Sequence, residues 1–209
     1  MSRSSAWRAY RPGVPPAFTG GSERGRAGAG AGRAIPPRVS PVLVLGLDPG
    51  SRITGFGLIE ASPAGTRYVA SGSIRVGVGD FAARLHEIHA GVAAIAAEHR
   101  PAEVAVERVF VHRNPDSALK LGQARGAALC ATFGAAAALF EYTPREVKLA
   151  VAGHGNAAKE QVQRMVKVLL GINGRLGADA ADALAIALCH AHGRVARSAL
   201  AAAAAGRAR

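Results

Sequence analysis

The feature that most limits the fold of this chain is an uninterrupted apolar run, VLVLGL, at residues 42–47, which ends at Asp48. A short aliphatic run bounded by a turn is typical of a strand that is buried on both faces. The residues that follow, 48–51 (DPGS), predict such a turn by their composition. A strand covered on both faces needs helices on each side of its sheet, so the run predicts an α/β domain.

The rest of residues 42–192 predicts one mixed sheet. Two strand patterns at 53–60 and 67–76 follow the first strand through short links, which favours an antiparallel meander. The later part alternates between helical and strand patterns: a helix at 80–99, a strand at 103–109, a helix at 115–137, a strand at 139–142, and helices at 157–170 and 178–192. This order predicts a five-stranded mixed sheet with helices on both faces, in a single domain.

Positive charge is concentrated at the two ends of the chain. The whole chain has 26 Lys and Arg against 14 Asp and Glu, a net charge of +12. Residues 1–41 hold seven arginines and one glutamate, and residues 193–209 hold four arginines around an alanine run, whereas residues 42–192 have a net charge of only +2. We therefore expect three parts: a basic extension (1–41), a folded domain (42–192) and a basic Ala- and Arg-rich tail (193–209).

The extension at 1–41 is rich in Gly, Pro and Arg and has no apolar periodicity, so we expect it to be disordered. Its glycines and prolines disfavour the amphipathic helix of a transit peptide. Three interpretations stay open: an inert tail, a start-site artefact with the compact chain beginning at Val39 or Val42, or a nucleic-acid-binding arm. We favour the first two over the third.

Composition excludes two classes of protein. The apolar runs are too short to cross a bilayer, so we expect neither an integral membrane protein nor a membrane partner. The two cysteines, Cys130 and Cys189, are too few for a disulfide scaffold. Both lie in apolar helical patterns, and we expect them to be buried, reduced thiols.

Four carboxylates stand at positions that the fold could bring together. Asp48 ends the first strand and Glu107 nearly ends the fourth, where an unpaired acid is costly. Asp179 and Asp182 are spaced i, i+3 and so share one face of the last helix. If the four meet at the carboxyl ends of the strands, a divalent cation would relieve their repulsion. Mg²⁺ suits such ligands and a phosphodiester substrate.

Each acid also has a structural interpretation. Asp48 could cap the turn that follows it, and Asp179 or Asp182 alone could serve the helix N-terminus. Glu107, between Val106 and Arg108 in an apolar strand, is harder to explain structurally.

Four motifs resemble the RuvC-type Holliday-junction resolvases in order and spacing. They are VLVLGLDPGSRITGFGLIE, VAVERVF, NPDSALKLGQARG and GADAADALAIA, and together they span the whole expected domain. The resemblance implies an RNase H-like fold and a homodimer that binds four-way DNA junctions in recombination and repair. It also implies symmetric Mg²⁺-dependent nicks in two strands of like polarity, leaving 5′-phosphate and 3′-hydroxyl ends.

The resemblance further implies a setting for the reaction. Members act with the RuvA and RuvB branch-migration proteins in the bacterial cytoplasm and prefer a short T-containing cleavage sequence. Two Mg²⁺ ions per active site are expected, with Mn²⁺ able to substitute.

The resemblance assigns roles to individual residues. The catalytic and metal-binding acids would be Asp48, Glu107, Asp179 and Asp182. Lys148 and Lys159 match basic residues important for DNA cleavage, although each could be an ordinary solvated lysine. Phe110 matches an aromatic residue that contacts bases near the crossover, although a core Phe at a strand end is the alternative. Arg113, in the basic loop after Phe110, is a candidate for DNA binding.

Other interpretations remain. Ala118, Gly122 and Gly126 form a small-residue ridge on one helix, which would allow close approach across a dimer or against the sheet. LGLDPGS also resembles the first phosphate loop of actin-like and sugar-kinase ATPases, but those proteins need a second domain for which this chain is too short. The remaining alternatives are a non-catalytic junction-binding protein and an RNase H-like nuclease for structured RNA.

Overall fold

The apolar run forms the central strand of a sheet. In the computed structural model, which describes residues 41–108 and 114–207, β1 (Val42–Asp48) lies in the middle of five strands in the order β3-β2-β1-β4-β5. β1 pairs antiparallel with β2 (Ile53–Ser62), which pairs antiparallel with β3 (Gly65–Arg75). On the other side, β1 pairs parallel with β4 (Glu103–Glu107), which pairs parallel with β5 (Ala138–Tyr142). The predicted meander and mixed sheet are confirmed.

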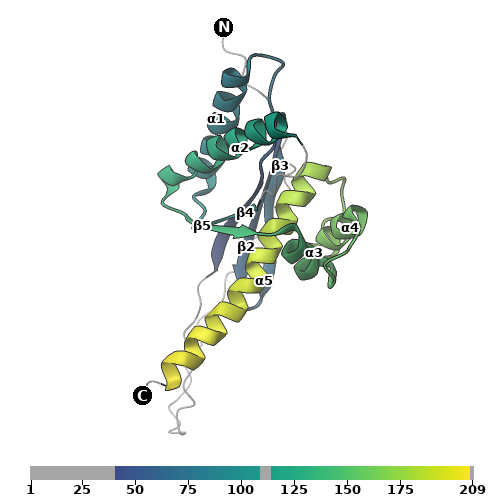
Figure 1. The fold of residues 1–209 in the computed structure, drawn as a ribbon. Helices are drawn as coiled ribbons and strands as arrows, with labels where there is room; N and C mark the ends of the chain where they lie inside the picture. The colour runs from purple at the N-terminus through teal and green to yellow at the C-terminus, as the bar shows by residue number, and fades with distance from the viewer. Residues whose placement is uncertain (1–40, 109–113, 208–209) are drawn as a thin grey trace, which may run out of the picture.

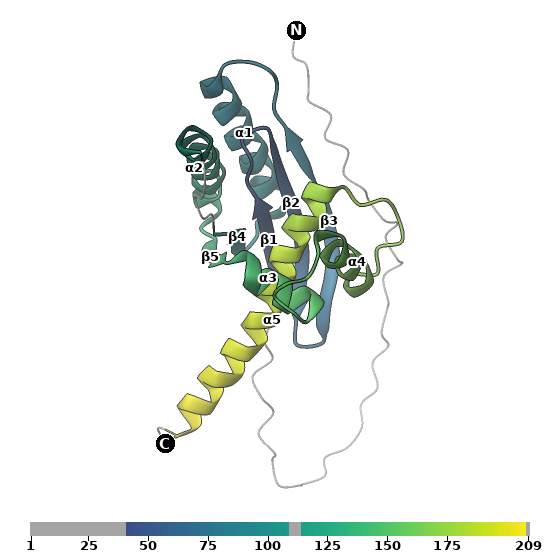
Figure 2. The same cartoon turned by 45° about the vertical axis from the view of Figure 1, so that its right-hand side comes forward.

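Helices cover both faces of this sheet, as Figures 1 and 2 show. α1 (Phe81–His99) and α2 (Pro115–Cys130) lie on one face. α3 (Pro144–Ala152), α4 (Lys159–Leu169) and α5 (Ala178–Arg207) lie on the other, and the C-terminal part of α5 extends beyond the sheet. The prediction of a single α/β domain with a covered central strand is therefore confirmed.

The central strand contributes side chains to two separate hydrophobic cores. Leu45 and Leu47 are fully buried against α1 and α2, whereas Val44 is fully buried in the core that includes α3, α4 and α5. Successive residues of a strand point to opposite faces, so a strand between two helical layers must be apolar at every position. This is the physical reason for the uninterrupted run.

A buried histidine ties α5 to the parallel half of the sheet. His190 on α5 is fully buried, and its Nε2 lies 2.6 Å from an oxygen of Glu103 on β4. Its Nδ1 lies 2.7 Å from the hydroxyl of Tyr142 on β5. Burial raises the pKa of Glu103, but hydrogen bonds from His190 and Arg194 outweigh burial and lower it. These polar contacts fix the lateral position of α5, whose first two turns carry two of the candidate acids.

The ends of two helices differ from the prediction. α2 ends at Cys130, not at residue 137, because the chain turns at Thr132, whose hydroxyl donates to the carbonyl of Leu129 at 2.8 Å. A short 3₁₀ turn, Phe133–Ala135, follows. α5 continues past residue 192 to Arg207, in line with the high helix propensity of its alanine run.

The sequence prediction also missed α3. Its start is a capping box: the hydroxyl of Thr143 accepts from the backbone N–H of Glu146, and the carboxylate of Glu146 accepts from the N–H of Thr143. Pro144 occupies the first helical turn. The pattern TPRE carries this signal and could have been recognised.

The two cysteines differ in burial. Cys189 is buried as expected, but Cys130 is exposed because α2 ends there, so that expectation was wrong. Within the described residues, none of the helices combines the length and the hydropathy that spanning a bilayer would require.

Candidate functional site

Two of the candidate acids lie side by side at one end of the sheet. Leu47 of β1 is paired with Val106 of β4, and the two strands run parallel. The next residue on each strand is an acid, Asp48 on β1 and Glu107 on β4. The carboxyl ends of neighbouring parallel strands thus bring these two half-buried carboxylates to one edge.

A patch of glycines lets α5 approach this edge. Gly46, Gly55 and Gly57 lie on β1 and β2, directly beneath the helix. A Cβ at Gly55 would lie 2.1 Å from the carbonyl oxygen of Asp179, and one at Gly46 would lie 2.1 Å from that of Ala183. No other residue type fits such close contact between a strand and a helix backbone.

This glycine patch (Gly46, Gly55 and Gly57) determines where the remaining acids stand. Gly55 is the cross-strand partner of Asp48, so the first turn of α5 lies over the strand position beside that carboxylate. Asp179 and Asp182 are both in that part of α5. The sequence analysis did not identify these glycines, although glycines at i and i+2 within a strand indicate a close backbone approach.

The electrostatics show that the four acids share one site. The pKa of Asp48 is raised from 3.8 to about 6 by burial and by the negative charges of Asp182 and Asp179, against the opposing effect of Lys159. Burial, followed by the charges of Asp48 and Asp182, also raises the pKa of Glu107. Acids of α5 are therefore close enough to the strand ends to disfavour the ionisation of Asp48 and Glu107.

Two lysines partly offset this negative charge. Lys159, the first residue of α4, places its Nζ 2.6 Å from a carboxylate oxygen of Asp182. Its side chain stays 59% exposed, so it can leave the carboxylate at little cost. The hydrogen bond to Asp182 raises the pKa of Lys159. Lys148 on α3 lies near enough to Glu107 to lower the pKa of that acid.

The donor set suits a hard divalent cation. Four carboxylates face two lysines, which leaves surplus negative charge at a partly buried site, and carboxylate oxygens are the ligands that Mg²⁺ prefers. Among residues 41–108 and 114–207, no three His, Cys, Asp or Glu side chains stand close enough together to hold a metal ion as they are. Lys159 occupies one side of Asp182, so the acids are held apart around an ammonium group.

Comparisons with known proteins identify the family. Residues 44–190 match the sequence model of the family described as "Crossover junction endodeoxyribonuclease RuvC". The chain belongs to the RuvC family. A RuvC protein of Alkalilimnicola ehrlichii, named crossover junction endodeoxyribonuclease, is 54% identical over 149 residues, which cover 71% of this chain and 90% of that protein.

Solved structures agree with this assignment. The RuvC of T. thermophilus in complex with a Holliday junction substrate has a TM-score of 0.68 at 38% identity and covers 73% of this chain and 94% of that chain. The yeast mitochondrial Holliday junction resolvase Ydc2 shares the fold, with a TM-score of 0.56 at 12% identity over 75% of this chain and 80% of its own. The predictions of a RuvC-type, RNase H-like fold and of a Holliday-junction resolvase, a hydrolase, are confirmed.

The structure of this RuvC protein brings six of the eight predicted site residues together. Four are the acids and two are the lysines, Lys148 and Lys159. Phe110 and Arg113, the predicted DNA-binding residues, lie outside the described residues. Their roles remain predictions.

Replacing Asp48 by Asn is expected to stabilise the metal-free RuvC protein above pH 6. When the pKa of a carboxyl is higher in the folded than in the unfolded chain, its ionisation lowers the free energy of unfolding. For Asp48 this cost is complete above pH 6 and disappears below about pH 4. At pH 7.5 in EDTA we expect Asp48→Asn to raise the free energy of unfolding by about 2 kcal/mol and the Tm by about 4–8 °C. Thermal unfolding from pH 4 to 8 measures the difference.

The control for this prediction is Asp80→Asn, which makes the same chemical change at the N-cap of α1, where Asn caps as well as Asp. The gain for Asp48→Asn should vanish near pH 4, and the control should show no such pH dependence. If Asp48→Asn were less stable than wild type at pH 7.5, the negative charge of Asp48 would already be balanced by positive charge in the metal-free wild-type protein.

Proposed function

We propose that this chain resolves four-way DNA junctions by nicking two strands of like polarity at symmetric positions, with Asp48, Glu107, Asp179 and Asp182 as the catalytic acids. The observation that carries this proposal is the raised pKa of a buried Asp48 beside three further carboxylates. Such a cluster destabilises the fold unless cations are bound there, which is the expected cost of a functional site. The products are 5′-phosphate and 3′-hydroxyl ends.

The four acids would hold Mg²⁺, with two ions per site and Mn²⁺ as a substitute. Bound cations would supply charge stabilisation for in-line attack of water on phosphorus and for the leaving 3′ oxygen. The chain itself positions the carboxylates, because the glycine patch and the strand register set the spacing between them. Asp48 is half-buried at the end of the central strand, directly after Leu47, which is fully buried.

Lys159 and Lys148 would act on the phosphate. Lys159 neutralises Asp182 in the free protein and, because its side chain is exposed, can turn toward a phosphate oxygen when substrate and cations arrive. Lys148, on the neighbouring helix α3, adds a second positive charge on the side of Glu107. This arrangement keeps the free protein from carrying four uncompensated acids.

A homodimer would present two such sites to one junction. On α2, a Cβ at Gly122 or Gly126 would meet no other atom of the described residues within 4 Å, so these two positions of the small-residue ridge leave room for a partner. Leu119 on the same helix is 61% exposed. A two-fold dimer through this helix would match the near two-fold symmetry of a four-way junction.

The setting of the reaction follows from the family. We propose that the chain is a cytoplasmic bacterial enzyme that acts in recombination and repair with the RuvA and RuvB proteins. Residues 42–192 form its nuclease domain, which the basic extension (1–41) and the basic tail (193–209) flank. The T. thermophilus structure contains a Holliday junction substrate, which supports four-way DNA as the ligand here. Membership of a nuclease family favours this enzyme over a non-catalytic junction-binding protein or an ATPase.

A synthetic four-way junction tests the proposed function. We expect purified protein with Mg²⁺ to produce paired nicks at symmetric positions and EDTA to abolish them. A linear duplex of the same sequence and a structured RNA serve as controls that separate the resolvase from an RNA nuclease. Equal cleavage of the RNA or of the linear duplex would contradict the proposal.

A further inference from the structure

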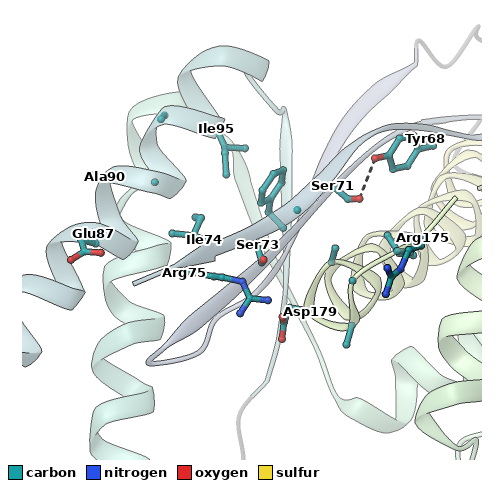
Figure 3. A pocket seen from close by; sticks show the side chains of 18 of the residues that line it. Tyr68, Ser71, Ser73, Ile74, Arg75, Glu87, Ala90, Ile95, Arg175 and Asp179 are labelled. Carbon is teal, nitrogen blue, oxygen red and sulfur yellow. Dashed lines mark hydrogen bonds between the residues drawn. The ribbon is translucent and has the colours of Figure 1, made fainter. Parts of the chain in front are cut away.

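A groove runs along the free edge of the sheet and reaches one of the four acids. β3 is an edge strand, and beside it lies a cavity of about 920 Å³ between α1 and the segment that leads into α5 (Figure 3). The groove is lined on one wall by Ser73, Ile74 and Arg75 of β3 and on the other by Arg175 and Asp179. Its apolar floor includes Ile95 of α1.

The groove begins at the candidate active site. Asp179 lines the groove and is also one of the four acids. Ser73 of β3 is the cross-strand partner of Gly55, which is itself the partner of Asp48. Asp179 therefore joins the groove to the acids, and a ligand bound at the acids can extend from there into the groove.

Two arginines in this groove lack partners. Arg75 and Arg175 are both exposed, and neither makes a salt bridge or a hydrogen bond with any of the described residues. In the view of Figure 3, Asp179 lies between them. By contrast, Arg67 on the same strand donates to Glu60 at 2.9 Å.

Two acids, Asp179 and Glu87, also line the groove, and among the described residues neither forms a salt bridge with Arg75 or Arg175. Glu87 on α1 accepts a hydrogen bond from the backbone N–H of Gly77 at 3.0 Å, and no salt bridge joins it to either arginine. His86 adds no fixed negative charge. An acidic site repels a polyanion, so unpaired guanidinium groups beside it are placed to hold the polyanion there.

We propose that this groove binds the DNA strand that continues from the scissile phosphate, with Arg75 and Arg175 contacting its backbone phosphates. The inference rests on the proposed function, because it takes the acids as the point where the strand is cut. The apolar floor suits sugar and base surfaces of a single strand, and the opposed arginines suit phosphates on its two sides. An acidic peptide would match the charge as well, but it would have no reason to lead into a cluster of carboxylates.

The test compares junction affinity between Arg75→Ala/Arg175→Ala and the wild-type protein. In EDTA and at about 0.1 M salt, each lost phosphate contact should weaken binding about five- to eightfold and reduce the slope of log K against log salt by about 0.7–0.9. The control is Arg67→Ala, which removes the same charge from the same strand outside the groove. Arg75 and Arg175 are both exposed, and thermal unfolding verifies that the variants fold.

A second measurement locates the contact on the DNA. Single neutral methylphosphonates are placed along the cleaved strand of the junction. One or two positions next to the scissile phosphate should weaken wild-type binding by a similar five- to eightfold and should have no further effect on the double variant.

The outcomes separate the two proposals. If wild-type protein binds junctions but does not nick them with Mg²⁺, the proposed function fails, and the affinities still decide whether the arginines contact DNA. If the double variant binds no more weakly than Arg67→Ala, or if it stays as sensitive as wild type to every methylphosphonate, the groove does not hold the strand. Wild-type protein without affinity for DNA would overturn both.

Discussion

Replacing Asp48 by Asn is expected to reduce junction cleavage by at least about 10³-fold while leaving junction affinity within about twofold of wild type. Asp48 is the most constrained of the four acids, because it lies on the central strand and is flanked by Glu107 on β4 and by the first turn of α5. An amide keeps its shape but cannot supply the charge that binds a divalent cation. Single-turnover cleavage and equilibrium binding of the same junction give the two values.

This variant separates a functional loss from a folding defect. Asp48→Asn is expected to be more stable than wild type in EDTA at neutral pH, since the pKa of Asp48 is raised by burial and neighbouring acids. An inactive protein that is also more stable cannot owe its inactivity to unfolding. The matched control, Asp80→Asn, should cleave at the wild-type rate. Cleavage by Asp48→Asn within tenfold of wild type would remove this residue from the chemistry.

Replacing Gly55 by Ala is expected to reduce cleavage about 10²-fold and to lower the free energy of unfolding by about 1–3 kcal/mol. The added methyl group would lie 2.1 Å from the carbonyl oxygen of Asp179, and a backbone atom cannot turn aside as a side chain can. The start of α5, which carries Asp179 and Asp182, must therefore move away from β2. Cleavage kinetics and urea unfolding measure the two effects.

The control for this prediction is Gly134→Ala, where the new Cβ meets nothing within 4 Å. That variant should match wild type in cleavage and stability. A Gly55→Ala protein that cleaves normally would show that the close approach of α5 to β2 serves packing alone and does not position Asp179.

Strand patterns and the positions of the acids could be predicted from the sequence because they follow from local rules. The run at residues 42–47 must be buried on both faces, and Asp48 and Glu107 end two strands that prove to be parallel neighbours. The i, i+3 spacing places Asp179 and Asp182 on one helix face wherever that helix lies. Periodicity and spacing do not depend on tertiary contacts, and these features were therefore accessible.

The parts that were missed depend on contacts between distant segments. The fit of α5 against Gly46 and Gly55 exists only once two strands and the last helix are assembled. The pairing of Lys159 with Asp182 joins the start of α4 to the start of α5, and no spacing rule predicts it. At the end of α2, the backbone N–H and the hydroxyl of Thr132 both donate to the carbonyl of Leu129, and the chain turns there despite the helix propensity of the alanines around it.

Most of the net positive charge lies in sequence outside the domain that carries the candidate active site. The net charge of +12 lies mostly outside residues 42–192, and the site itself is acidic. Under the two proposals, attraction for DNA within the domain would come from a few side chains: Lys159 and Lys148 at the acids, and Arg75 and Arg175 in the groove. Position therefore matters more than net charge for how this domain meets its substrate.

The most direct test of the central claim, that these acids form a divalent-cation site, is to count the Mn²⁺ ions bound per chain. Titration with Mn²⁺, followed by the electron paramagnetic resonance signal of the free ion, gives this number without requiring activity. The account predicts two ions per chain for wild-type protein and the loss of at least one in Asp48→Asn, with Asp80→Asn unchanged. Equal Mn²⁺ binding by wild type and Asp48→Asn would contradict it.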